Sequence, residues 1–598
     1  MNAPAPQPAR ADQLGARAAL LLYAALTPLL TWPLVVASGR ALAVRGDYAL
    51  NLWNFWWVRQ VFSSDGAGLY WTDALDHPIG VSLARHELSP LNAAVGALLS
   101  SFVDPHDAFR WLVGIHFWLS AWTFFLFARA VTGSGLGAFL AGLFWSFGPF
   151  HFYYLAQLNV VTLEFLPLAG WSMVRSYREG GVRNALGVGL ATALIAASSS
   201  YYVVYAALLG GALLAGGRLW SPETPWRRGA ARLALAGGAA AAAAALVAMP
   251  LLLSGASAEM DPVAVTAAKR EALVRSNDLL GFLWVGPPET AIVTWPSMLG
   301  WSTLMLASLG MRRERPRVFW LGLALLFALL SLGPVLRVAG NSTGLPLPYG
   351  LLSELPVLWM LRKPDRMLAL VQLPVGVLLA FGWQALSARL PAPGVRLAVA
   401  AACAALLALE RLTVPLETFP VTDTPYLAQL ARETEVRAVV HLPHGGGSPA
   451  DGRANLLQTR HGKPIAQGYV VDLALGPAQR ALASEWGRAY ERLAAGDGEP
   501  VAELSRRDGI DRVLLHKQVP RSRDPRFAPG AIVWAPFTLV GRELVAIRQL
   551  GPLEEVAVPA MLLATQKRAL ASRFGEPVYE DDVLVAYAVE RATFGVRR

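Results

Sequence analysis

The stretch RGDYALNLWNFWWVRQVF, residues 45–62, follows the first long apolar segment of the chain and decides how the rest is interpreted. Trp53, Trp56, Trp57 and Phe62 recur near helical spacing, and Trp and Tyr favour the interface between lipid and water. The spacing predicts a helix that lies along a membrane surface. Such a helix would hold Asp47 just above the lipid headgroups.

The composition supports a membrane protein. Of the 598 residues, 54% are hydrophobic and only 16% charged, and the mean hydropathy is +0.41. The one cysteine, Cys403, lies in an apolar run, which excludes intramolecular disulfides and Cys-based metal sites. The net charge of +10 comes mostly from dispersed Arg, with no basic block long enough to follow a phosphate backbone, so a nucleic-acid partner is excluded.

Apolar runs of about 17–25 residues can cross a bilayer as helices. Arg10 and Arg17 precede the first run without a cleavage pattern, which predicts an uncleaved anchor. The stretch 185–217 is long for one helix and short for two, and a reentrant pair bent at Ser198-Ser199-Ser200 is an alternative there. We predict a polytopic α-helical membrane protein with eleven spans at 18–37, 111–131, 137–155, 158–174, 185–200, 202–217, 233–253, 291–310, 318–337, 367–386 and 395–414.

The charges orient these spans. Lys and Arg beside spans are retained in the cytoplasm, and placing the N-terminus inside puts the Arg-rich connections there and most acidic residues outside. The C-terminus then lies outside. We therefore predict a bacterial inner-membrane protein with a transmembrane domain at 1–417, a first periplasmic loop at 38–110, and a periplasmic α/β domain at 418–598. The predicted strands are Val436–Leu442, Arg512–Leu515, Ala531–Trp534, Leu544–Ile547 and Val583–Val589, and the predicted helices are Pro477–Ala495 and Pro500–Asp508.

Several residues of the first loop could carry chemistry. A carboxylate at Asp47 could act as a general base toward a hydroxyl acceptor, or it could only cap the surface helix. The acidic residues and histidines further along fit no recognised metal loop, and turn chemistry around Pro78 and Pro90 is the simpler interpretation. These residues are Asp73, Asp76, His77, His86 and Glu87.

Charged residues elsewhere are also unusual. Glu164 lies within a predicted span, so it either serves a function, joins a buried pair or reaches out to the interface. Arg362, Lys363 and Arg366 gather on the predicted outer side, where they could bind a lipid phosphate, bind anionic headgroups in general, or pair with Asp365. In the outer domain His441, His444 and His461 lie near Gly445–Gly447 and Asp451; a strand-to-loop turn is favoured there over a zinc site.

These features together resemble the GT-C superfamily of integral-membrane glycosyltransferases, which use polyprenyl-phosphate-linked sugars. The resemblance covers about residues 18–415 in architecture and is weaker in the outer domain. It is closest to a group of bacterial membrane proteins assigned to that superfamily. The stretches that carry it are GD (46–47) with Trp53 and Trp56-Trp57, HPIG (77–80), LSPLN (88–92), LGP (332–334) and LRKPDR (361–366).

The resemblance implies an inverting sugar transfer. The loop Asp of the family, matched by Asp47, would deprotonate the acceptor, and cations matched by Arg362, Lys363 and Arg366 would hold the leaving phosphate. His86, Glu87 and Glu164 are further predicted substrate-binding residues. Many relatives carry a second acidic residue beside the loop Asp, where this chain has Tyr48, and no outer Asp-x-Asp motif is present. We therefore predict no cofactor and no metal requirement.

The leading functional hypothesis is a glycosyltransferase that moves one sugar from a polyprenyl-phosphate donor to an envelope glycan, lipid or protein. A flippase for lipid-linked glycans is the first alternative, although transporters usually carry ionisable residues inside several spans, and here only Glu164 and Glu410 qualify. A non-catalytic membrane scaffold with a periplasmic binding domain is the second alternative.

Overall fold

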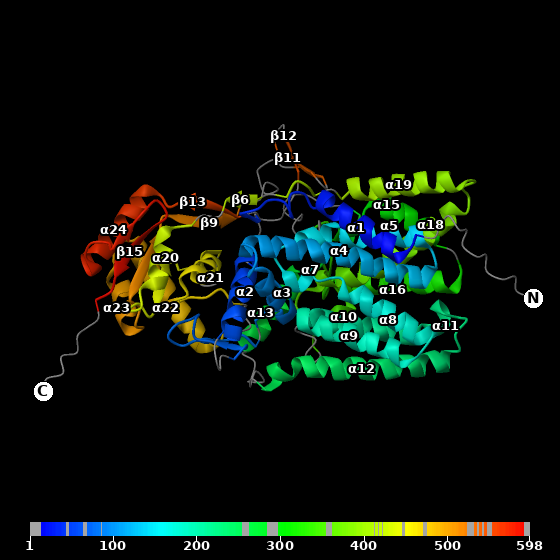
Figure 1. Cartoon of the computed structure of the whole chain (residues 1–598), viewed down its shortest axis with the longest axis horizontal. Helices are drawn as coiled ribbons and strands as arrows, with labels where there is room; N and C mark the ends of the chain where they lie inside the picture. The colour runs from blue at the N-terminus through cyan, green and yellow to red at the C-terminus, as the bar shows by residue number, and fades with distance from the viewer. Residues whose placement is uncertain are drawn as a thin grey trace, which may run out of the picture.

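The computed structural model shows an elongated molecule with a helical body at one end and a sheet-containing domain at the other (Figure 1). The structure describes residues 14–42, 47–63, 68–84, 86–253, 262–283, 297–311, 313–354, 361–411, 413–416, 418–420, 423–444, 449–470, 475–522, 532–534, 537–540, 543–546 and 553–590.

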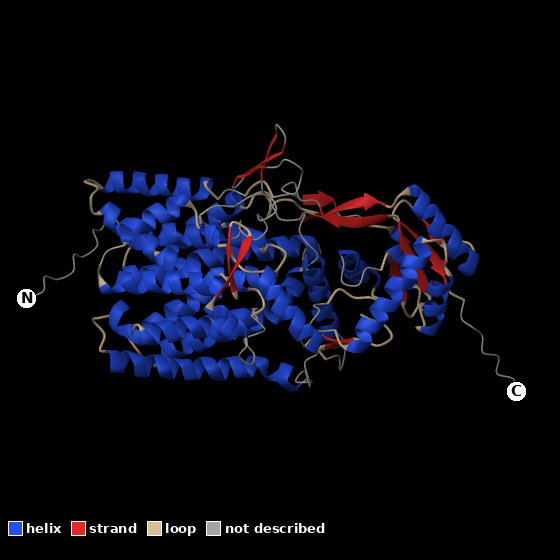
Figure 2. Cartoon of the chain, turned by 180° about the vertical axis from the view of Figure 1, so that it is seen from behind, coloured by secondary structure: helices blue, strands red, loops and turns tan. Residues whose placement is uncertain are grey.

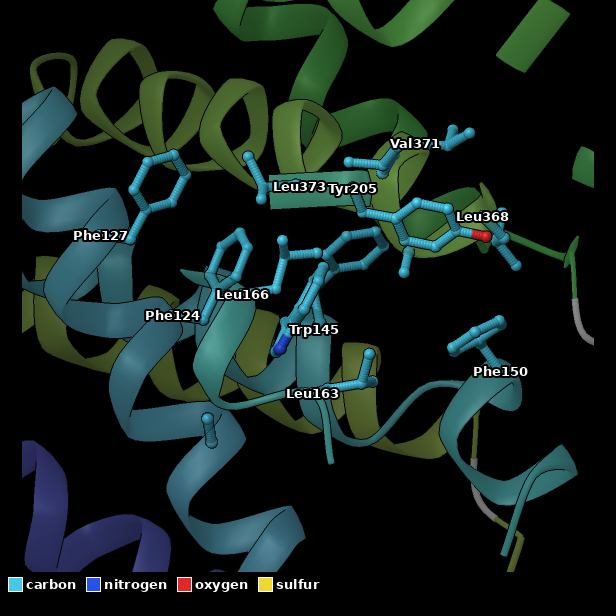
Figure 3. Close-up of a cluster of buried hydrophobic side chains, with 14 of the residues drawn as sticks. Phe124, Phe127, Trp145, Phe150, Leu163, Leu166, Tyr205, Leu368, Val371 and Leu373 are labelled. Carbon is cyan, nitrogen blue, oxygen red and sulfur yellow. The ribbon is translucent and has the colours of Figure 1, made fainter. Parts of the chain in front are cut away.

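The helical body consists mostly of helices that run along the long axis of the molecule (Figures 1 and 2). Its core is lined by aromatic rings, such as Phe124 and Trp145, whose ring centroids lie 4.9 Å apart (Figure 3). The helices are α1 (Ala16–Leu30), α4 (Pro105–Thr132), α5 (Gly135–Ser146), α6 (Pro149–Tyr153), α7 (Leu158–Val161), α8 (Phe165–Arg178), α9 (Val182–Ser198), α10 (Ser200–Ala215), α11 (Gly217–Trp220), α12 (Trp226–Leu253), α15 (Trp301–Gly310), α16 (Arg315–Ser331), α18 (Leu368–Ser387) and α19 (Pro393–Leu409).

Most predicted spans correspond to one helix, but several differ in their bounds or are divided. The span 18–37 ends at Leu30 and the span 395–414 at Leu409, while the described part of the span 291–310 is α-helical only from Trp301. The span 137–155 is divided into α5 and α6 at Gly148-Pro149, because proline cannot continue a helix interior. The span 158–174 is divided between α7 and α8. The span 318–337 ends at Ser331, since Gly333 has a φ of +77° and Pro334 follows.

The stretch 185–217 forms two helices, because Ser199 is extended between α9 and α10, at the serines where the sequence suggested a bend. Residues 291–296 of the eighth predicted span lie outside the described residues. Three helices of the described chain are long and apolar enough to cross a membrane, Pro105–Thr132, Trp226–Met249 and Pro364–Ser387. The count of eleven spans stays a prediction.

Shorter elements cover the end of the body that faces the sheet-containing domain. The stretch predicted as a surface helix forms the helix α2 (Asp47–Ser63), which runs across the direction of the long helices (Figure 1). The other elements here are β1 (Arg40–Leu42), β2 (Trp71–Thr72), β3 (Val81–Ser82), α3 (Pro90–Leu99), α13 (Pro262–Val274), η2 (Leu279–Phe282), β4 (Val335–Val338), β5 (Asn341–Pro346), α17 (Pro348–Ser353) and η5 (Pro364–Met367).

The sequence places the aromatic rings of α2 at a membrane surface, and this placement is wrong for Trp53 and Trp57. Trp53 is fully buried and Trp57 nearly so, and their rings stack at 5.7 Å. The Trp53 indole Nε1 donates to Gln458 Oε1 of the sheet-containing domain at 2.8 Å. An amphipathic indole suits a membrane interface, but it equally suits a protein interface that offers an acceptor.

The part of the chain from Thr418 onward, which we call the outer domain after its predicted location, contains a four-stranded sheet in the order β14-β15-β8-β7. β7 and β8 are parallel, and the other pairs are antiparallel. The predicted strands and helices of this region are confirmed within a few residues. The elements are β6 (Thr418–Pro420), α20 (Pro425–Arg432), β7 (Val439–Leu442), α21 (Pro449–His461), α22 (Pro477–Ala494), α23 (Glu499–Arg507), β8 (Arg512–His516), β9 (Gln518–Ser522), β10 (Ile532–Trp534), β11 (Phe537–Val540), β12 (Glu543–Ala546), β13 (Leu553–Ala557), α24 (Ala560–Phe574), β14 (Tyr579–Glu580) and β15 (Leu584–Ala588).

Both faces of the outer-domain sheet are buried, and the first loop covers one of them. Side chains alternate between the faces of a strand. In β8, Val513 and Leu515 pack with Trp486 of α22, whereas Leu514 packs in a separate cluster with Trp53 of α2. The outer domain and the first loop therefore share a hydrophobic core. The shared cluster contains Trp53, Trp57, Leu75, Val81, Leu83, Leu88, Tyr426, Leu430, Val436, Val439, Ala454, Ile465, Val470, Leu514, Leu584 and Ala586.

Candidate active site

Asp47 is the first residue of α2, and its carboxylate joins three parts of the chain. Its Oδ2 accepts a short hydrogen bond from Gln157 Nε2, which lies between α6 and α7. Its Oδ1 accepts from the hydroxyl of Tyr469 of the outer domain at 3.0 Å. Within the described residues both carboxylate oxygens are thus engaged by other segments, which is a larger role than capping α2.

Gln157 connects Asp47 to the cations that the sequence singled out. Its Oε1 accepts from Arg366 Nη2 at 2.5 Å while its Nε2 donates to Asp47. A side-chain amide has one acceptor end and one donor end, so a guanidinium on one side and a carboxylate on the other fix its orientation. Asp47 and Arg366, far apart in sequence, are therefore linked through one side chain.

Arg366 lies in η5 and is fully buried. Its guanidinium lies over the ring of Tyr201 at 4.6 Å and over that of Tyr154 at 5.4 Å, and its Nη1 is 3.9 Å from Glu87 Oε1. Among the described residues, neither Nε nor Nη1 has a hydrogen-bond acceptor. Buried donors are normally satisfied, so these N–H groups are available to an anion.

Arg362 and Lys363 share one counter-ion, Glu271 of α13. Arg362 Nε is 3.1 Å and Lys363 Nζ 3.5 Å from the Glu271 carboxylate. The sequence offered Asp365 as a possible partner of these cations, but Asp365 pairs instead with Arg275 at 3.1 Å. The alternative in which Asp365 pairs with its immediate neighbours is therefore not supported, because its carboxylate contacts Arg275 and the hydroxyl of Tyr154 instead.

Glu87 is the second carboxylate beside these cations. Burial acts to raise the pKa of Glu87, but the charges of Arg366, Lys363 and Arg362 outweigh it and hold the pKa below its usual value. Glu87 is therefore ionised at neutral pH. The three cations face two carboxylates, Glu87 and Glu271, which leaves one net positive charge in the cluster.

His86 supports α2 and, in the described contacts, does not reach Asp47. Its Nε2 lies 3.2 Å from Asn54 Oδ1, and burial lowers the pKa of His86 to about 4, so the ring is neutral at pH 7. The turn interpretation of the preceding stretch is confirmed, because Ile79 and Gly80 donate backbone hydrogen bonds to the Asp76 carbonyl.

Glu164 is buried in the helical body in a separate cluster. Its Oε1 lies 2.7 Å from His116 Nδ1 of α4, and Ser120 Oγ donates to Oε2 at 3.4 Å. The buried-pair alternative is confirmed, and Glu164 does not reach the interface. Among the described contacts nothing brings it to Asp47.

The outer-domain histidines form a chain of rings. Lys463 N donates to His461 Nδ1 at 3.0 Å, so the other nitrogen of a neutral His461 donates to His441 Nε2, 3.2 Å away. His441 Nδ1 then donates to His516 Nε2 at 2.9 Å. Because His441 uses opposite nitrogens for its two neighbours, the three rings do not converge on one point.

The zinc alternative is not supported by this arrangement. Among the described residues no group of three or more His, Cys, Asp or Glu could hold a metal ion. His444 and Asp451 lie in the same region and are buried. The predicted turn at residues 445–447 lies outside the described residues.

Sequence reasoning missed several members of the site. Gln157 and Tyr201 each lie in a short connection between predicted spans, where a polar or aromatic residue on the outer side could have been noted. Arg275 and Glu271 lie in a predicted outer segment that is rich in charge. Tyr469 gave no signal, because a lone Tyr after a helix is common.

No protein-family model matches the sequence, and no curated protein matches it. Solved structures do. The arabinofuranosyltransferase AftD from Mycobacteria superposes with a TM-score of 0.55 at 17% identity, over 97% of this chain and 42% of AftD, and a second AftD structure gives 0.54 at 18%. This chain therefore spans less than half the length of AftD.

Two further structures are similar at lower scores. The archaeal oligosaccharyltransferase AglB from Archaeoglobus fulgidus has a TM-score of 0.48 at 11% identity, over 84% of this chain and 69% of AglB. ArnT from Cupriavidus metallidurans has 0.45 at 12%, over 96% of this chain and 98% of ArnT. The likeness to AftD extends over 97% of this chain, through the helical body and the outer domain, so the chain shares the fold of AftD.

Proposed function

We propose that this protein is a membrane glycosyltransferase that transfers a sugar from a polyprenyl-phosphate donor to an envelope glycan, lipid or protein on the periplasmic side. The observation that carries the proposal is the link from Asp47 through Gln157 to Arg366, whose buried N–H groups lack acceptors among the described residues. The Gln157 side chain thereby joins the carboxylate of Asp47 to the proposed anion site at Arg366. AftD, which shares the fold, is named as a glycosyltransferase.

The proposed reaction uses the two ends of this link. Asp47 accepts the proton of the acceptor hydroxyl, and the acceptor oxygen forms a bond to the anomeric carbon from the face opposite the phosphate. The bond between that carbon and the phosphate oxygen breaks, and the polyprenyl phosphate leaves with its electron pair. Arg366, with Arg362 and Lys363, holds the growing negative charge.

The net positive charge of the cluster suits this task. Glu87 and Glu271 neutralise two of the three positive charges, which limits the repulsion among Arg362, Lys363 and Arg366. One positive charge remains to attract a phosphate. The fork of a guanidinium binds two phosphate oxygens at once, and stacking on Tyr201 and Tyr154 holds its plane. The proposed donor phosphate would lie against Nε and Nη1 of Arg366.

Donor consumption tests the proposal. Membranes containing wild-type protein or Asp47→Asn would receive radiolabelled polyprenyl-phosphate arabinofuranose, mannose, glucose or galactose with crude envelope acceptor, and released polyprenyl phosphate would be measured. We expect turnover of one donor by wild type and a loss of at least about a hundredfold in Asp47→Asn, since removing a general base typically costs that much. The matched control is Asp73→Asn, an exposed carboxylate of the same loop, which should retain wild-type turnover.

Other outcomes would redirect the assignment. Equal turnover in wild type and Asp47→Asn would remove Asp47 from the chemistry. No turnover with any donor would favour the flippase or the scaffold, and flux of a lipid-linked glycan across vesicles would separate those two.

A further inference from the structure

Hydrogen bonds, together with segments of α2 and α21, form a closed ring that connects Asp47 to the outer domain. Six residues after Asp47 on α2, Trp53 Nε1 donates to Gln458 Oε1 of α21 at 2.8 Å. One turn earlier on α21, Asn455 binds the backbone of Tyr469, whose hydroxyl returns to Asp47. The ring passes from α2 to the outer domain and back to the same helix.

Each connection of this ring is specific. Tyr469 N donates to Asn455 Oδ1 at 3.0 Å and Asn455 Nδ2 donates to Tyr469 O at 3.1 Å, so both backbone groups of Tyr469 are fixed. Asn455 and Gln458 are both fully buried, and three residues apart on a helix they share one face. Gln458 Nε2 also donates to Ala74 O of the first loop at 2.6 Å.

The ring places two donors on Asp47 from two different bodies. Gln157 of the helical body engages Oδ2, and Tyr469 of the outer domain engages Oδ1. One donor alone leaves the carboxylate plane free to turn, whereas two donors define it. A general base transfers a proton efficiently only when its lone pair is aimed at the acceptor hydroxyl, and each oxygen keeps a second lone pair for that purpose.

Resting on the proposed function, we propose that Tyr469 is a positioning residue for Asp47, so that the outer domain completes the active site of the helical body. Asn455 positions the backbone of Tyr469, and Gln458 holds α21 against α2 and the first loop, so both residues act on Asp47 through Tyr469. The outer domain thereby has a part in the chemical step besides any part in binding an acceptor.

The test compares variants of the full-length protein with the radiolabelled donor that wild type consumes in the panel above. Tyr469→Phe keeps the ring and removes only the hydroxyl. We expect kcat per folded protein to fall about tenfold, the scale of one hydrogen bond to a charged group, while KM for the donor and the thermal midpoint stay at wild-type values. Asn455→Ala, which frees the Tyr469 backbone and leaves the hydroxyl in place, should lower kcat in the same direction.

The matched control is Tyr579→Phe. Tyr579 OH donates to Asp581 Oδ2 at 3.0 Å, so the control removes a hydrogen bond of the same type and length in the same domain, and no described hydrogen bond joins Tyr579 to Asp47. It should leave kcat unchanged. A merely structural role for Tyr469 would lower the amount of folded protein and its midpoint, which normalisation to folded protein separates from kcat.

The outcomes are distinct. Wild-type kcat per folded Tyr469→Phe, with Asp47→Asn inactive, would overturn this inference and leave the proposed function standing. Full activity of Asp47→Asn would overturn the proposed function itself. A fall in kcat in Tyr469→Phe that Tyr579→Phe shares would also overturn the inference, because the effect would then not be specific to Asp47.

Discussion

Arg366 and Arg411 are both buried arginines in the helical part of the molecule, but their surroundings differ. Arg411 donates to Phe144 O at 2.9 Å and to Thr303 Oγ1 at 2.8 Å, and its guanidinium stacks over Phe144 at 4.4 Å. Arg366 stacks in a similar way but has a single described hydrogen-bond acceptor, Gln157. The contacts of Arg411 indicate a structural role, whereas those of Arg366 indicate a ligand.

This difference predicts how the two residues respond to the same change. Arg366→Lys keeps the charge but removes the fork and the stacking plane, so we expect KM for the donor to rise about tenfold or more. Steady-state kinetics with varied donor concentration measures it. Arg411→Lys is the control, for which we expect a lower thermal midpoint and an unchanged donor KM. A wild-type donor KM in Arg366→Lys would argue against phosphate binding at this residue.

At the scale of residues, the sequence predicted several charged members of the site, but it missed Arg275 and Glu271 as well as the neutral members. Asp47, Glu87 and Arg366 stand out because charges beside apolar spans are rare. Gln157 and Tyr469 reach Asp47 across sequence separations of 110 and 422 residues. Local spacing carries no information about such contacts, which depend on the packing of the completed fold.

Strands β7 and β8 bring two histidines into the chain of rings, and the helix α21 supplies the third. Burial lowers the pKa of His441 and His516, and burial with the charge of Lys463 lowers the pKa of His461 to about 3. An unfolded chain would protonate them near their usual value of 6.5. Below that pH the unfolded state binds more protons than the folded state, so folding stability falls.

We therefore expect acidification to destabilise the outer domain. Between pH 6.5 and about 3, His461 alone removes up to about 1.4 kcal/mol of stability per pH unit, and above pH 6.5 the effect is absent. His441 and His516 act in the same direction, because burial also lowers the pKa of each. The thermal midpoint of the full-length protein, followed from pH 7.5 to 5, checks this. His461→Gln should be less stable at pH 7.5 but lose less on acidification, and equal slopes would contradict the assignment.

At the scale of elements, helices were predicted better than their interruptions. The break at Ser199 followed from polar residues in an apolar run, and the strands of the outer domain followed from their length. The division at Gly148-Pro149 was visible in the sequence, but apolarity on both sides concealed it. The burial of Trp53 was unpredictable locally, because only the outer domain supplies the Gln458 acceptor.

At the scale of the whole molecule, the site residues from separate connections meet at one end. The first loop, the joint at Gln157, Tyr201, and the segment around Arg366 all lie on the predicted outer side, and the structure brings them together. The Arg-rich connections of α11 and α12 lie at the opposite end (Figure 1). Successive predicted spans run in opposite directions, so the sequence predicted which connections lie at the same end of the helical body.

Sidedness can be tested with single cysteines. In a Cys403→Ala background, Glu503→Cys places a thiol on exposed α23 of the outer domain, and Arg227→Cys places one at the exposed start of α12. We expect a membrane-impermeant maleimide to label Glu503→Cys and not Arg227→Cys in intact spheroplasts, because the Arg-rich end is retained inside. Lysed membranes should label both. The reverse pattern in intact spheroplasts would invert the topology.

The core that the first loop shares with the outer domain has a consequence for biosynthesis. Trp53, Leu75 and Leu83 are translated before their packing partners Leu514, Leu584 and Ala586, which follow in the sequence only after the whole helical body. Until then the growing protein must carry an unpaired apolar surface outside the membrane. A ribosome stalled before the last strands would leave that surface exposed to chaperones and proteases, so quality control of this protein should be sensitive to C-terminal truncation.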